Sequence, residues 1–178
     1  KLANIFKQKK IKNLVFCNYA PQFEKFLFWC QQLIAESLGK KGKGFFPIIS
    51  NTPKDHHSLL QLYLDGPKDK IFYIFSLEEN SNIKLITKKL VNKASFLNNK
   101  KIEEIKIAQK NALIKALKNK KIPFREFKIK KLNEETLSEL FSYYILETII
   151  LGQLTNINPF DQPAVEKVKV FTKDLLKN

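Results

Sequence analysis

"KIFYIFSL", residues Lys70–Leu77, is the stretch that decides the fold, because apolar residues fill it almost completely. Eight residues of β-branched and aromatic character are too few to span a membrane and predict a strand buried on both faces. Three further stretches have the same character, at Asn13–Tyr19, Phe45–Ser50 and Pro123–Ile129. We therefore expect a sheet that lies inside the molecule.

Amphipathic runs of helical period separate these strands, and Asn133 is a typical N-cap for one of them. The predicted helices cover about Pro21–Leu38, Asp55–Leu64, Lys101–Lys120, Asn133–Leu151 and 161–178. Strands that alternate with helices of this length favour a mainly parallel sheet with helices on both faces. The sequence has no internal repeat and no Gly/Ser-rich linker. It predicts an α/β fold, a three-layer αβα sandwich, as one domain over residues 1–178 with a C-terminal helix over about 161–178.

The net charge of +15 first suggests a nucleic-acid-binding protein. Of the 32 basic residues only Arg125 is an arginine, so the bidentate guanidinium groups that such surfaces use are nearly absent. Lysines that cover solvated faces explain the charge more simply, and we expect no nucleic-acid partner. The charge still favours anionic ligands, and a phosphorylated metabolite qualifies as well as a polymer does.

No apolar run approaches the ~20 residues that a membrane span needs, and the N-terminus has no signal-peptide core. We therefore expect a cytoplasmic protein without a membrane partner. Cys17 and Cys30 match no metal or redox spacing, which favours two buried free thiols. The chain contains no Met, even at position 1, so we expect it to be part of a longer protein.

Two groups of polar residues are candidates for chemistry. The apolar face of the helix at Pro21–Leu38 leaves Gln32 and Glu36 together on another face, four residues apart and just before Gly39, a candidate left-handed cap. The adjacent pair His56 and His57 starts the next helix, with Asp55 as a candidate cap. A solvated glutamate and two polar residues at a helix start remain the simpler alternatives. A metal site is poorly supported, because adjacent side chains on a helix point about 100° apart.

A third motif, "FDQPAVEKVK" at Phe160–Lys169, closely resembles the C-terminal motif of the phosphoglucose isomerase (glucose-6-phosphate isomerase) family, Phe-Asp-Gln-x-Gly-Val-Glu-x-x-Lys. It departs from that motif at Ala164, where many members have glycine. "QQLIAESLGK" and "DHHSLLQLYLDG" are similar, in family order, to the segments that carry the catalytic glutamate and the catalytic histidine.

The resemblance implies a sugar-isomerase (SIS) fold and a role for five residues. Glu36 would be the base that moves a proton between C1 and C2 of the sugar through a cis-enediol. His57 would open the sugar ring, helped by Lys169, while Gln32 and Gln162 would bind the substrate or its phosphate. His56 receives no catalytic role. No metal or other cofactor is implied, because both hydrogens that move do so as protons.

The resemblance also implies the partners. The substrates would be glucose 6-phosphate and fructose 6-phosphate, in glycolysis and gluconeogenesis. A first, N-terminal SIS domain would supply a phosphate loop and an arginine, so this chain would be the second domain of the enzyme and inactive alone. The histidine segment would reach the site of a neighbouring subunit, which implies a homodimer. The alternative from another class is a regulatory module that binds sugar phosphates without catalysis.

Overall fold

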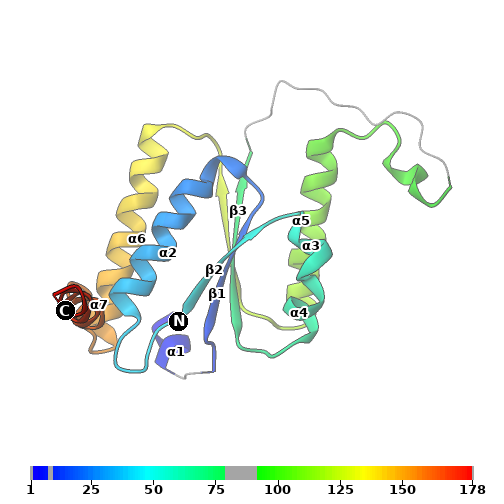
Figure 1. The fold of residues 1–178 in the computed structure, drawn as a ribbon. Coiled ribbons are helices and arrows are strands. Elements are labelled where there is room, and N and C mark those ends of the chain that lie inside the picture. The colour runs from blue at the N-terminus through cyan, green and yellow to red at the C-terminus, as the bar shows by residue number, and fades with distance from the viewer. Residues whose placement is uncertain (1, 8–9, 79–91, 178) are drawn as a thin grey trace.

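A four-stranded parallel sheet forms the centre of the molecule (Figure 1). The computed structural model describes residues 2–7, 10–78 and 92–177. In the described ranges the strand order is β2-β1-β3-β4, and every neighbouring pair is parallel. The strands are β1 (Asn13–Asn18), β2 (Phe46–Asn51), β3 (Lys70–Leu77) and β4 (Phe124–Ile129). The four predicted strands and the parallel sheet are confirmed.

Helices connect the strands and cover both faces of the sheet. They are α1 (Leu2–Lys7), α2 (Glu24–Leu38), α3 (Asp55–Ser58), α4 (Leu60–Asp65), α5 (Ile102–Asn119), α6 (Glu134–Leu154) and α7 (Pro163–Leu175). Short 3-10 helices cover Pro21–Phe23 and Asn92–Leu97. The lysine- and asparagine-rich connection between β3 and α5 falls largely on residues 79–91, outside the described residues.

The helix predictions hold except near the N-terminus and after β2. Helix α1 was not predicted, and it is held by Phe6, whose ring meets that of Phe45 edge-on at 5.0 Å. The single helix predicted over Asp55–Leu64 is broken at Leu59, where φ is −119°. The predicted N-cap is confirmed, because the Asn133 side chain accepts a hydrogen bond from the backbone N–H of Thr136.

The core divides into two layers because successive strand residues point to opposite faces of the sheet. Phe16 and Tyr73 face α1, α2 and α6, whereas Val15 and Phe72 face α4 and α5. All four are at most 1% exposed, and burying such a side chain stabilises the fold by about 1.5–3 kcal/mol. The predicted three-layer sandwich is thus confirmed.

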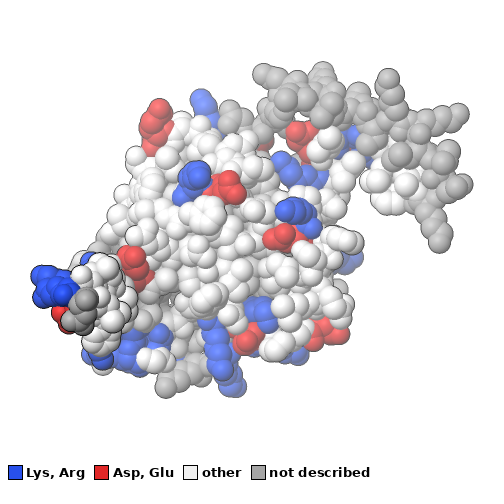
Figure 2. Space-filling model, in the orientation of Figure 1, with Lys and Arg blue, Asp and Glu red and all other residues white. Residues whose placement is uncertain are grey.

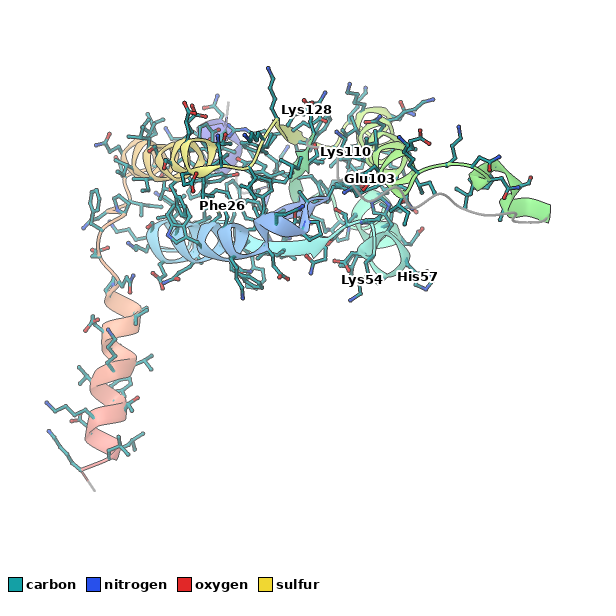
Figure 3. The ribbon with its side chains drawn as sticks, turned by 90° about the horizontal axis from the view of Figure 1, so that it is seen from above. Phe26, Lys54, His57, Glu103, Lys110 and Lys128 are labelled. Carbon is teal, nitrogen blue, oxygen red and sulfur yellow. The ribbon has the colours of Figure 1, made fainter. Side chains whose placement is uncertain are left out.

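Helices α2 and α6 join through aromatic side chains, and Phe26 lies at the centre of this contact (Figure 3). Its ring is 5.3 Å from that of Phe141 and 5.8 Å from that of Tyr144. This packing fixes α2 against α6 and therefore sets where the ends of both helices lie. Cys17 and Cys30 are buried free thiols, as predicted, and burial raises the pKa of both.

Helix α7 projects from the body of the molecule (Figures 1 and 3). None of its residues is buried. Its exposed apolar residues are Val165, Val168, Val170, Phe171 and Leu175. The helix therefore has an apolar surface that the described part of the chain does not cover.

Candidate functional site

The end of helix α2 carries the first two candidate residues, and a close backbone approach shapes this end. A Cβ atom at Gly39 would lie 2.5 Å from the carbonyl oxygen of Ala35, so only glycine fits. The predicted left-handed cap is wrong, because φ of Gly39 is −78°. A tight loop follows, with left-handed backbone at Lys41, Gly42 and Gly44, and leads directly into β2.

Glu36 lies near the amino ends of the strands, because α2 runs antiparallel to β1 (Figure 1). The amide of Gln31, in the same part of α2, donates to the carbonyl oxygen of Pro47 at the start of β2 at 2.8 Å. Ligands of such sheets are expected beyond the carboxyl ends of the strands. Helix α2 carries Glu36 back to the opposite edge of the sheet, away from that position.

The carboxylate of Glu36 accepts two amide hydrogen bonds. Gln32 donates from Nε2 to Oε1 at 3.2 Å, which confirms that the two side chains share a face of α2. Gln162 donates from Nε2 to Oε2 at 2.8 Å, across 126 positions of sequence. With one amide on each oxygen, the carboxylate is held in one orientation. Glu36 is half-buried and both glutamines are exposed.

Gln162 reaches Glu36 because the connection between α6 and α7 folds against the end of α2. Lys40 donates to the carbonyl oxygen of Asn158 at 2.6 Å and to the carboxylate of Asp161 at 2.9 Å. Lys43 donates to the carbonyl oxygen of Thr155 at 2.8 Å. A positive charge at this point is favourable, because the C-terminus of α6 carries the negative end of the helix dipole.

An open pocket of about 450 Å³ lies between α2 and this connection, a volume typical of small-molecule sites. It is lined by Ala35, Glu36, Gly39, Lys40, Lys41, Ile157, Asn158, Asp161, Gln162, Pro163, Ala164 and Val165. The Lys40 ammonium lowers the pKa of Asp161, chiefly through its hydrogen bond. The pocket thus combines an oriented carboxylate with cationic and amide donors and an apolar wall.

His57 does not lie in this pocket. It is exposed on α3, which follows the carboxyl end of β2, and Figures 1 and 3 place α3 and α7 on opposite sides of the molecule. The predicted cap by Asp55 is wrong, since Lys54 is the N-cap of α3. The Asp55 carboxylate instead accepts bonds from the Ser50 hydroxyl at 3.0 Å and from the backbone N–H of Asn51 at 2.8 Å.

Lys169 lies on α7, exposed, and pairs with Glu166 one turn earlier at 2.7 Å. It does not line the pocket of Glu36. Ala164, the departure from the family motif, is the second residue of α7 and has no positive φ. Alanine therefore fits the backbone at this position. Of the five predicted site residues, the chain brings together Glu36, Gln32 and Gln162, and it leaves His57 and Lys169 elsewhere.

The sequence analysis missed Lys40 and Asp161, which join the first and third motifs. Both stand inside the stretches quoted for the resemblance, and their opposite charges were the signal that could have paired them. Within the described ranges, no group of three or more His, Cys, Asp or Glu residues is suited to hold a metal ion. In the same ranges, no helix combines the length and hydrophobicity that a membrane span requires.

Charged side chains form no continuous basic band on the face seen in Figure 2. Lysine and arginine lie there in small groups, with acidic and uncharged residues between them. On this face, the distribution is the one expected of lysines that cover a solvated surface.

Comparison with known proteins gives a consistent set of relatives. The chain is 36% identical over 162 residues to a probable glucose-6-phosphate isomerase of Methanococcus maripaludis, a match that covers 91% of the chain and 36% of the relative. It is 36% identical over 171 residues to glucose-6-phosphate isomerase of Methanocaldococcus jannaschii, a match that covers 92% of the chain and 40% of the relative. It is 33% identical over 168 residues to glucose-6-phosphate isomerase of Mycoplasmopsis synoviae, over 93% of the chain and 39% of the relative. The chain thus spans about two-fifths of the length of these relatives.

Solved structures share the fold. A hypothetical protein from Thermus thermophilus superimposes with a TM-score of 0.85 at 26% identity, over 99% of this chain and 44% of the other. A glucose-6-phosphate isomerase from Chlamydia trachomatis gives a TM-score of 0.77 at 17% identity, over 93% of this chain and 34% of the other. No family model matches the sequence.

Proposed function

Because the chain is homologous over about nine-tenths of its length to glucose-6-phosphate isomerases, we propose that it forms part of an enzyme that interconverts glucose 6-phosphate and fructose 6-phosphate. The observation that carries the proposal is the hydrogen bond between Gln162 and Glu36. It joins two motifs that are far apart in sequence at a single pocket, and both motifs resemble those of the isomerases.

Glu36 is the proposed base. It takes a proton from C2 of the open-chain aldose while O1 gains one, which gives a cis-enediol, and it then returns the proton to C1 while O2 loses one. The two amide bonds hold the carboxylate ready for this transfer, since orientation before reaction lowers the barrier. A positioned general base contributes about 10²–10⁴ in rate. Gln32 and Gln162 are the proposed substrate contacts, with N–H groups available to hydroxyl or phosphate oxygens.

His57 and Lys169 are the proposed ring-opening residues, with His57 acting on the sugar ring and Lys169 assisting it. His57 lies on the side of the molecule away from the Glu36 pocket. A homodimer, in which α3 of one subunit reaches the pocket of the other, accounts for this separation. The exposed apolar surface of α7 is likewise consistent with a further domain of a longer protein. We also propose a cytoplasmic location and a role in glycolysis and gluconeogenesis.

A coupled assay of the full-length protein tests the proposal. Fructose 6-phosphate should be converted into glucose 6-phosphate, which a dehydrogenase then oxidises with an absorbance change. The competing function is a regulatory module that binds sugar phosphates without turnover. Calorimetric binding of either sugar phosphate without conversion would favour that module and contradict the isomerase.

A further inference from the structure

Lys40 is the more shielded partner of an ion pair at the pocket. Its side chain is 11% exposed, although that of its partner Asp161 is 52% exposed. The ammonium donates at 2.6 Å to the carbonyl oxygen of Asn158 and at 2.9 Å to the carboxylate of Asp161. Hydrogen bonds from an ionised donor are roughly twice as strong as those between neutral groups. Lys40 therefore ties the end of α2 to the start of α7.

Two neighbouring sets of hydrogen bonds join the end of α2 and the loop after it to the connection before α7. Glu36 lies in the last turn of α2 and Lys40 two residues beyond the helix, and their partners Gln162 and Asp161 are neighbours in sequence. The Gln162 to Glu36 bond and both bonds of Lys40 are exposed to water, but Lys40 makes two of the three and carries a charge. Helix α7 has no buried residue that could fix its start. The two bonds of Lys40 therefore hold the segment that carries Gln162 beside Glu36.

We propose that Lys40 is a positioning residue for the Glu36 carboxylate. By holding Asn158 and Asp161, it keeps the Gln162 amide on Oε2 and so fixes the orientation of the carboxylate. Lys40 acts through Asp161 and Gln162 and takes no part in the proton transfer. The kinetic consequence of this inference rests on the proposed isomerase function. The structural link between Lys40 and Gln162 does not depend on that function.

The kinetic test uses Lys40→Met in the full-length protein, a change that removes the ammonium and keeps an unbranched chain of similar length. A misplacement of about 1 Å costs on the order of 10²-fold in rate, so kcat should fall by about that factor while KM changes much less. Lys40→Arg, which can still donate to both oxygens, should restore much of the loss. The matched control is Lys120→Met, which breaks another lysine–aspartate pair, at 3.0 Å from Asp65, outside the pocket. It should keep the kcat of the parent protein.

A spectroscopic test separates this inference from the proposed function. In protein labelled with ¹⁵N-glutamine, the side-chain amide resonance of Gln162 should shift in Lys40→Met towards its position in Glu36→Gln. If the parent protein has no isomerase activity, the proposed function fails, yet this shift still decides the role of Lys40. Unchanged kcat or an unchanged Gln162 resonance in folded Lys40→Met overturns the inference. If that variant does not fold, Asp161→Asn, which weakens one of the two contacts, must shift the Gln162 resonance in the same direction, and no shift overturns it.

Discussion

The two adjacent histidines have separate surroundings. His56 Nε2 shares a hydrogen bond of 2.6 Å with the Tyr19 hydroxyl, and the two rings meet edge-on at 5.7 Å. Tyr19 is 2% exposed and follows β1, so His56 attaches α3 to the end of that strand. Together with the bonds of Asp55 to β2, this contact leaves His57 facing solvent. His56 thus has a structural partner, which the sequence did not predict.

The surroundings of His56 predict a pH dependence of stability. Burial lowers the pKa of His56, and the charge of Asp55 opposes this effect only in part. The unfolded chain, with a histidine pKa near ~6.5, then binds the proton more readily than the folded chain. The free energy of unfolding should therefore fall as pH drops through about 6.5 and level off below the folded pKa. Urea unfolding between about pH 8 and pH 5 measures this trend.

The comparison variant is His56→Gln, which cannot titrate in this range. Its free energy of unfolding should depend less on pH near 6.5 than that of the parent protein. Identical pH profiles for the two proteins would contradict the account of His56.

Among the elements, the loop after α2 contains two glycines that are needed for different reasons. Gly39 has an ordinary φ but no space for a Cβ atom, whereas Gly42 has φ of 66° with nothing within 4 Å of a Cβ atom. Gly39→Ala should lower the free energy of unfolding by about 1–3 kcal/mol, as overpacking does. Gly42→Ala should cost about 1–2 kcal/mol from its left-handed backbone alone.

Activity distinguishes the two alanine variants further. Gly39→Ala should also lower kcat, because any shift of Ala35 or Gly39 moves the adjacent Glu36 and Lys40. Gly42→Ala should leave kcat close to that of the parent protein. Urea unfolding and the isomerase assay measure both effects. Equal kcat values for the two variants would contradict the conclusion that a Cβ atom at Gly39 displaces Glu36 and Lys40.

Elements were predictable where local composition decides them. The strands follow from β-branched and aromatic runs, and the sheet order is then restricted by the parallel connections. Three details escaped prediction because tertiary contacts decide them. Helix α1 packs against Phe45, and the helix predicted over Asp55–Leu64 is interrupted at Leu59. The Asp55 carboxylate accepts hydrogen bonds from Ser50 and Asn51. In the site, the helical spacing predicted that Gln32 and Glu36 share a face, but no local rule could show that Gln162 reaches them.

At the scale of the whole molecule, the proposed catalytic residues do not come together in one chain. Glu36 lies at the pocket beside α7, His57 lies on the opposite side of the molecule (Figure 3), and Lys169 is exposed on α7. The chain also spans only about two-fifths of the length of the relatives that it matches. The proposed homodimer and the proposed further domain would account for both facts.

We predict that residues 1–178 alone lack isomerase activity. The pocket of Glu36 would be present, but the proposed phosphate loop and arginine of the first domain would not. The isolated chain and the full-length protein should be compared at equal concentration in the coupled assay, with sedimentation to record the oligomeric state. Isomerase activity of the isolated chain above the uncatalysed rate would contradict this prediction.

The central claim is that Glu36 moves the proton between C1 and C2, and proton exchange at C2 tests it most directly. The full-length protein and its Glu36→Gln variant should be incubated with glucose 6-phosphate in deuterium oxide, and deuterium at C2 followed by NMR. We predict exchange in the parent protein and a loss of about 10²–10⁴-fold in the variant. Exchange at the parent rate in folded Glu36→Gln would contradict the claim.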